Sequence, residues 1–200
     1  GSASTASGTS ASGADCWNYY DSNSLKIDES AYAMDDMVIL FAMGNDGMDC
    51  TSGSWGQSSC AGGQNGEINL GWMNRQATAK NILSIGASES FRPSMMQQYS
   101  AMCNSVGPPP CPLPHTNEKW GTEPIASDTR GDNPEGMAAF SNRGPTSEGR
   151  IKPDLVAPGT YIYSVYSSEA HADGCTDCYM SLDGTSMATP ITAGSAALII

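Results

Sequence analysis

Ser186 lies in a stretch of sequence that suits a nucleophile. The run from Gly184 to Pro190 reads GTSMATP, with a glycine two residues before the serine and mostly small residues after it. A glycine lets a substrate carbonyl approach the backbone closely. The free N–H groups of a helix's first turn favour negative charge and would stabilise the oxyanion formed when such a serine is acylated. A serine that only caps a buried helix fits the same residues.

The elements that would position this serine follow from the apolar pattern. The continuous apolar run Met37–Met43 and the segment Asn81–Ala87 are typical of strands buried on both faces of a parallel sheet. Tyr161–Tyr166 alternates and predicts a further strand. Met137–Phe140 is a candidate short strand before a turn.

Two helices are expected. Residues 28–36 predict a helix capped by Asp28, with Ile27, Ala31 and Met34 on one face. From Ser186 onward, small and apolar residues predict a tightly packed buried helix that reaches Ile200 without a capping signal. Strands followed by a final helix indicate an α/β fold, and the chain reads as a single domain.

Composition excludes some functions. The formal net charge of −12 opposes binding to nucleic-acid phosphates, and no apolar run approaches the roughly 20 residues of a membrane helix. Acidic loops suit Ca²⁺, although an acidic surface that promotes solubility is the simpler interpretation. No EF-hand loop is present, so metal ligands stay unassigned. The first 13 residues lack the charged and apolar regions of a signal peptide, as expected of a mature secreted protein or an internal piece.

The cysteines indicate an oxidising compartment. Of the 7 cysteines, Cys50 and Cys60 bracket one short loop and Cys103 and Cys111 bracket another, which predicts local disulfides. The C-x-x-C of residues 175–178 lacks the second pair that a zinc site needs, so a disulfide is favoured there too. The odd count leaves one thiol, such as that of residue 16, for a partner outside the chain.

The run Gly184–Pro190 resembles the nucleophile motif of the subtilase (S8) family. Four other segments resemble family motifs in the family's order: Phe41–Gly47, Asn81–Ala87, Phe140–Pro145 and Lys152–Gly159. The resemblance extends over a partial catalytic domain of residues 1–200 and is clearest over 37–200, nearest to an alkaline, oxidation-resistant branch. It implies a subtilisin-like three-layer α/β fold with a mainly parallel central sheet, incomplete at both ends.

The resemblance also implies a serine endopeptidase and assigns roles to residues. Ser186 would be the acylated nucleophile, and Asn45 would donate its side-chain amide to the oxyanion beside the N–H of Ser186. Strong turn chemistry in the sequence Gly-Asn-Asp-Gly offers a simpler explanation for Asn45. The expected partner is a protein or peptide substrate, with no cofactor needed for the chemistry. We expect a monomer that is extracellular or in the secretory pathway.

Substrate contacts are implied next to these two residues. They are expected from Ala42, Met43, Gly44, Asp46, Gly184 and Thr185, with residues 42–44 forming one wall of the pocket for the P1 side chain. Asp46 at the rim of that pocket predicts a preference for Lys or Arg at P1. Phe41 and Met43 suit a hydrophobic P1 side chain equally well.

The family's other catalytic groups lack counterparts in this sequence. The acid motif D-[ST]-G and the base motif H-G-T-x-x-A do not occur, and the only histidines, His115 and His171, lie in proline-rich and polar surroundings typical of solvated side chains. We expect the acid and base N-terminal to Gly1 and the 200 residues alone to be inactive. A catalytically dead subtilase-fold binding module and a Ca²⁺-organised structural domain are the alternatives.

Asp183 departs from the family pattern. The position before Gly184 is usually Ser or Gly, whereas this sequence has an aspartate. A carboxylate there is expected to oppose a developing oxyanion slightly.

Overall fold

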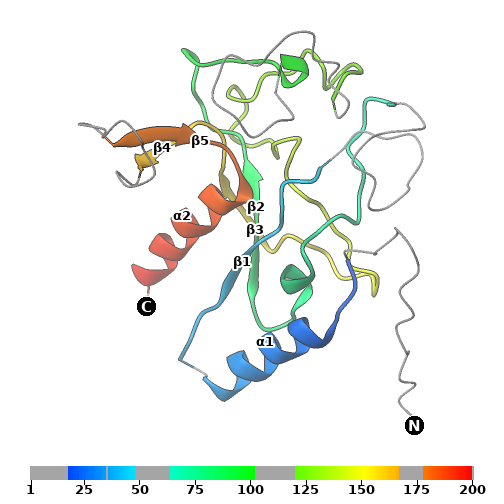
Figure 1. Cartoon of the computed structure of the whole chain (residues 1–200), viewed down its shortest axis with the longest axis vertical. Helices are drawn as coiled ribbons and strands as arrows, with labels where there is room; N and C mark the ends of the chain where they lie inside the picture. The colour runs from blue at the N-terminus through cyan, green and yellow to red at the C-terminus, as the bar shows by residue number, and fades with distance from the viewer. Residues whose placement is uncertain (1–17, 35, 48–63, 102–119, 167–177, 200) are drawn as a thin grey trace.

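The described part of the chain is built on a parallel sheet. The computed structural model describes residues 18–34, 36–47, 64–101, 120–166 and 178–199. Within them, β1 (Leu40–Ala42), β2 (Leu83–Ser88) and β3 (Leu155–Pro158) pair in parallel in the order β1-β2-β3. Figure 1 shows α2 (Thr185–Ala197) lying beside this sheet, and α2 contacts all three strands. The predicted α/β fold is confirmed.

β2 forms the centre of the core. Its residues from Ser84 onward are buried, because β2 pairs on both edges and is covered on its faces. Ile85 and Ala87 belong to a buried cluster with aromatic residues that lie outside the sheet and with one residue of α2: Tyr99, Trp120, Phe140 and Ala188. The predicted strand Asn81–Ala87 is therefore confirmed, displaced by about one residue at its end.

Two strand predictions need correction. β1 is much shorter than the predicted Met37–Met43, and Met37 and Val38 are 43% and 47% exposed. Among the described residues β1 pairs only with β2, so its start is not enclosed as a central strand would be. Met137–Phe140 is not a strand. Met137 makes a single bridge to Ser88, and the backbone then turns, with the N–H of Ser141 donating to the oxygen of Ala138 at 3.0 Å.

An antiparallel hairpin leads into α2. β4 (Ile162–Val165) confirms the predicted strand at Tyr161–Tyr166 and pairs with β5 (Tyr179–Leu182). The sequence analysis missed β5, because its four residues mix polar and apolar types without clear alternation. The rings of Tyr163 and Tyr179 stack at 5.4 Å between centroids.

Helix α1 (Ser22–Ala33) starts earlier than predicted. Its cap is Asp21, whose carboxylate accepts from the N–H groups of Asn23 and Ser24 at 2.9 Å each. The prediction that Asp28 caps the helix is wrong, because Asp28 lies inside it and is buried. The inward face does repeat at helical spacing, but it includes Ser24 and Asp28, so an apolar pattern alone misplaced the helix start.

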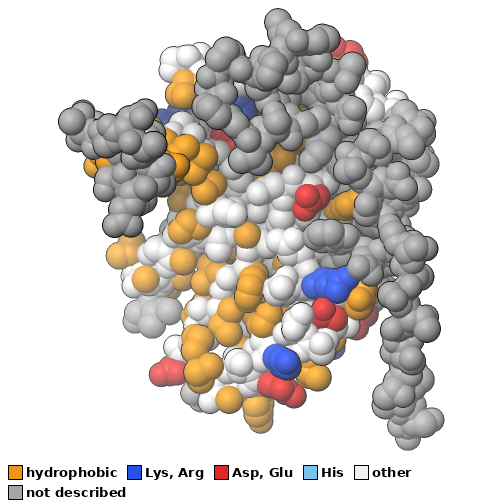
Figure 2. Space-filling view, viewed as in Figure 1, with side chains coloured by type: hydrophobic (Ala, Val, Ile, Leu, Met, Phe, Trp, Pro, Cys, Tyr) orange, Lys and Arg blue, Asp and Glu red, His pale blue; other side chains and the backbone are white. Residues whose placement is uncertain are grey.

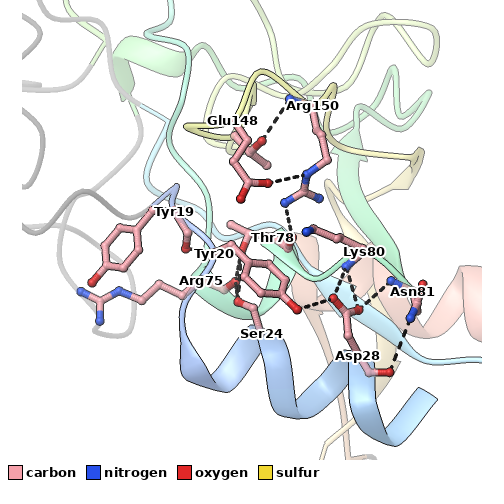
Figure 3. Close-up of polar contacts among 11 residues, drawn as sticks. Tyr19, Tyr20, Ser24, Asp28, Arg75, Thr78, Lys80, Asn81, Glu148 and Arg150 are labelled. Atoms are coloured by element: carbon pink, nitrogen blue, oxygen red, sulfur yellow. Dashed lines mark hydrogen bonds and ion pairs between the residues drawn. The ribbon is translucent and has the colours of Figure 1, made fainter. Parts of the chain in front are cut away.

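Hydrogen bonds attach α1 to the chain that enters β2. The carboxylate of Asp28 accepts from the N–H groups of Lys80 and Asn81, at 2.8 and 2.7 Å, and from the hydroxyl of Tyr20 at 2.8 Å (Figure 3). One turn earlier, the hydroxyl of Ser24 donates to the carbonyl of Arg75 at 2.8 Å, in the short helix η1 (Arg75–Thr78). A second short helix, η2 (Tyr99–Ala101), lies in the otherwise irregular region after β2.

Helix α2 is less buried than predicted. Among its described side chains only Thr185 and Ala188 are buried, and Ile191 is 38% exposed. Figure 2 shows hydrophobic side chains gathered over the face where Figure 1 places β1 and α2. The helix ends at Ala197 with Leu198 as its cap, so the prediction of an uncapped helix to Ile200 is wrong.

Candidate active site

The fold brings residues 42–46 to the start of α2. Parallel strands end at one edge of a sheet, and β1 ends at Ala42, directly before Met43, Gly44 and Asn45. The side-chain oxygen of Asn45 accepts from both the N–H of Thr185, at 2.8 Å, and its hydroxyl, at 3.0 Å. The N–H of Gly44 donates to the same hydroxyl oxygen at 3.2 Å. Two segments about 140 residues apart in the sequence thus meet at one point.

Gly184 is the cap of α2 and lies against Asn45. Its φ is +151°, a conformation that side chains rarely adopt, and a Cβ there would lie 3.2 Å from the amide nitrogen of Asn45. Its own N–H donates to the oxygen of Gly159, which follows β3, at 2.7 Å. Both the conformation and the close approach therefore favour glycine at this position.

Ser186 is exposed in the first turn of α2, and Asn45 is exposed opposite that turn. Because the oxygen of the Asn45 amide is occupied by Thr185, its NH₂ group is directed away from that residue. No described residue accepts a hydrogen bond from this NH₂ group, so it is available to a ligand. An exposed serine and a free amide donor at a helix N-terminus are the components of an acyl-transfer site.

Asn142 is a positioning residue that the sequence analysis missed. It is almost fully buried, and its amide holds the loop on both sides of Asn45, donating to the oxygen of Met43 at 3.1 Å and accepting from the N–H of Asp46 at 2.7 Å. Its own N–H donates to the oxygen of Gly44 at 3.0 Å. The signal was its place inside the quoted segment Phe140–Pro145, at the variable position of that pattern.

The predicted wall of the P1 pocket is held mainly through its backbone. The side chain of Met43 is completely buried and packs with Met73 and Ala77, so only its main chain can face a substrate. Asn74 binds this segment from the other side: its N–H donates to the oxygen of Met43 at 2.8 Å and its amide to that of Ala42 at 3.3 Å. The buried Met43 side chain therefore gives no support for a hydrophobic P1 preference.

Comparison with known protein families identifies the family of the chain. The subtilase family model matches residues 2–200. The chain belongs to the subtilase family. The relatives include the serine protease/ABC transporter B family protein tagB of Dictyostelium discoideum, 32% identical over 162 residues, which is 62% of this chain and 8% of that protein.

Two further subtilase relatives match shorter stretches. The serine protease AprX of Bacillus subtilis is 42% identical over 80 residues, 37% of this chain and 18% of that protein. Pyrolysin of Pyrococcus furiosus is 52% identical over 64 residues, 32% of this chain and 4% of that protein. The chain thus spans less than a fifth of the length of each of these relatives.

Asp183, the aspartate that departs from the subtilase pattern, is paired with a positive charge. Asp183 forms an ion pair with Arg130, and its other carboxylate oxygen accepts from the N–H of Tyr161 at 2.6 Å. The expectation that Asp183 repels an oxyanion assumed that its charge is uncompensated. The sequence could not show the pairing, because Arg130 lies 53 residues away.

Several predicted features lie outside the described residues. Both histidines and six of the seven cysteines lie there, so their roles stay predictions. Within the described ranges, no three His, Cys, Asp or Glu side chains cluster as a metal site would require. In the same residues, no helix is both long and apolar enough to cross a bilayer.

Proposed function

We propose that this chain is the nucleophile-bearing part of a serine endopeptidase. The hydroxyl oxygen of Ser186 attacks the carbonyl carbon of a peptide bond, and the amide of Asn45 and the N–H of Ser186 donate to the oxyanion that forms. The C–N bond of the peptide then breaks, and the amine leaves with the proton that the base took from the hydroxyl of Ser186. Water hydrolyses the acyl-enzyme to the carboxylic acid and free Ser186. The observation that supports this most directly is the contact of Asn45 with Thr185, the residue before the serine.

A serine hydroxyl needs a base to take its proton, and the base needs an orienting acid. Neither family motif for these groups is present among the 200 residues. We propose that both are contributed N-terminal to Gly1 and that the 200 residues alone are inactive. A catalytically dead subtilase-fold domain would show the same absence, so only reactivity of the complete protein separates the two.

The proposed substrate is a protein or peptide that lies against the backbone of residues 42–44. Asp46 is half-buried beside this segment and attracts Lys or Arg at P1. Paired peptide substrates that differ only in P1 Lys or P1 Leu test the preference. A higher kcat/KM for the lysine peptide, lost in Asp46→Asn, is expected, and a strong preference for Leu in the wild type would contradict it.

The proposed setting is extracellular or in the secretory pathway, as a monomer. The cysteine content supports an oxidising compartment, as does Cys178, which is disulfide-bonded with its partner outside the described residues. The acyl-transfer chemistry itself needs no cofactor. Structural Ca²⁺ bound through acidic loops stays a proposal without assigned ligands.

The deciding experiment is labelling by a fluorophosphonate, which reacts with activated serines. In the complete protein, we expect stoichiometric labelling that Ser186→Ala abolishes. Ser195→Ala is the matched control, because Ser195 is an exposed serine of the same helix and its loss should leave labelling unchanged. A folded wild type that is not labelled would indicate a catalytically dead or structural domain.

A further inference from the structure

A largely buried ion pair involves the residue directly before the segment Gly184–Pro190. Asp183 begins the two-residue turn between β5 and α2 and forms an ion pair with Arg130. The side chains of Arg130 and Asp183 are only 9% and 18% exposed. An ion with so little water around it must be compensated by protein groups, so each member depends on the other.

The pair connects three loops around the start of α2. A second nitrogen of the Arg130 guanidinium donates to the side chain of Gln97, and the guanidinium lies 4.8 Å from the centre of the Tyr161 ring. The hydroxyl of Tyr161 accepts from the backbone N–H of Gln97 at 3.0 Å. The backbone N–H of Tyr161 donates to the carboxylate of Asp183. Arg130 is therefore held in one orientation toward Asp183.

Tyr161 has an uncommon backbone conformation at the same point. Its φ is +51°, the only positive value among the described non-glycine residues. The N–H that this conformation directs toward Asp183 fixes the carboxylate from a second side, at 2.6 Å. The carbonyl of Gly159, two residues earlier, binds the N–H of Gly184 at 2.7 Å. Both residues of the turn before Thr185 are thus attached to the segment 159–161.

We infer that Arg130 is a positioning residue for the proposed acyl transfer. It cancels the charge of Asp183 and holds the turn that carries Gly184, so that the donors around the oxyanion keep their orientation and their positive potential. This inference rests on the proposed function of Ser186 and Asn45.

The physical reason is the closeness of Asp183 to the donors. Asp183 is adjacent to Gly184, and Gly184 lies against the amide nitrogen of Asn45, with 3.2 Å between that nitrogen and a Cβ placed on the glycine. Negative charge develops at this point only during the reaction. An uncompensated carboxylate nearby therefore raises the barrier to acylation more than it weakens the binding of a neutral substrate.

The test measures kcat and KM of the complete protein with an uncharged peptide substrate. Arg130→Met should lower kcat at least about tenfold and leave KM within about twofold, since the interaction is with developing charge. Adding Asp183→Asn to Arg130→Met should restore kcat to within about threefold of the wild type, because the added change removes the uncompensated charge and keeps an oxygen for the N–H of Tyr161. A purely structural role predicts that the double variant is no better than the single one.

Two further variants make the result specific. Arg92→Met removes the same charge from an exposed residue whose N–H binds the oxygen of Gly131, next to Arg130, and should leave kcat unchanged. If Arg130→Met does not fold, Arg130→Lys and Arg130→Gln replace it: Lys should retain most of the kcat and Gln should lose it. Equal kcat in these two variants would overturn the inference.

The outcomes also separate this inference from the proposed function. A wild type that no fluorophosphonate labels contradicts both. A wild type that is labelled, with Arg130→Met labelled at the same rate, contradicts only the role of Arg130.

Discussion

Asn45 is oriented by Thr185. Its amide oxygen accepts from the N–H of Thr185 at 2.8 Å and from the hydroxyl of Thr185 at 3.0 Å, which leaves the NH₂ group beside Gly184, two residues before the exposed Ser186. The same hydroxyl oxygen accepts from the N–H of Gly44. A single threonine hydroxyl therefore joins the two segments that carry the proposed nucleophile and the proposed oxyanion donor.

Replacing Thr185 by Val should misorient Asn45 with little change in volume. We expect kcat of the complete protein to fall about tenfold or more, because one of two hydrogen bonds that fix the amide is lost and the buried N–H of Gly44 loses its acceptor. Thr185→Ser keeps the hydroxyl and should retain most of the activity. Steady-state kinetics on one peptide substrate checks both variants, and equal kcat in Val and Ser variants would contradict the orienting role.

The fall in kcat caused by Thr185→Val cannot exceed the fall caused by removing the Asn45 amide altogether. In subtilisin, removal of one oxyanion-hole donor lowers kcat about 10²–10³-fold. Asn45→Ala should approach that range here, and Thr185→Val should lie below it, since the misoriented amide is still present.

Gly44 and Gly149 form a matched pair for testing the role of close packing. Both have positive φ, +105° and +82°, but a Cβ on Gly44 would lie 2.4 Å from the amide nitrogen of Asn142, whereas nothing lies within 4 Å of one on Gly149. Gly149→Ala should cost only the backbone strain, about 1–2 kcal/mol in the free energy of unfolding. Gly44→Ala should cost more and also lower kcat, because Asn142 can no longer hold the loop of Asn45.

Urea unfolding of the two glycine variants, with kinetics alongside, checks this prediction. A Gly44→Ala variant that is as stable and as active as Gly149→Ala would show that the contact between Gly44 and Asn142 is not needed to position the loop.

The sequence draws attention to those candidate site residues that are adjacent in the chain. Gly184 and Ser186 could be proposed because the chemistry expected of them needs adjacent residues, which a sequence shows directly. Asn142 and Arg130 were not, because they act on backbone and charges that are distant in the chain and become neighbours only in the fold. Family order related Asn45 to the serine, but only the structure shows that Thr185 orients it.

Two of the errors in secondary structure have a common cause. Apolar periodicity locates buried side chains, and α1 buries Ser24 and Asp28, whose partners are backbone groups of residues 75–81. The start of the helix was therefore placed too late. Met137–Phe140 is apolar because it packs into the core around β2, although its backbone forms one bridge and a turn instead of a strand.

Asp28 should be one of the more costly positions to change outside the site. Its buried carboxylate accepts from two backbone N–H groups and from Tyr20, so Asp28→Ala leaves two N–H donors without an acceptor. We expect a loss of about 2–4 kcal/mol in the free energy of unfolding. Glu29→Ala, at the exposed neighbouring position, should change it by less than about 0.5 kcal/mol. Equal losses, measured by urea unfolding, would show that these hydrogen bonds contribute little.

Glu89 should make the stability of the protein depend on pH. It is buried at the end of β2, and burial raises its pKa from 4.5 to about 7, although the hydroxyl of Tyr99 donates to it at 2.6 Å. The charges of Asp128 and Asp132 add to the increase. The folded state therefore binds a proton that the unfolded state has already released between pH 4.5 and about 7. Stability must fall as the pH rises through that window.

Glu89→Gln should remove this fall, because an amide does not ionise and its oxygen can still accept from Tyr99. A pKa difference of this size corresponds to about 3 kcal/mol, so the variant should unfold at higher urea concentration than the wild type at about pH 8 and at a similar one at about pH 4.5. Glu135→Gln, which changes an exposed carboxylate, should leave the pH dependence as it is. If wild type and Glu89→Gln lose stability in parallel over the window, the fall arises from other groups, and Glu89 is ionised in the folded protein without cost.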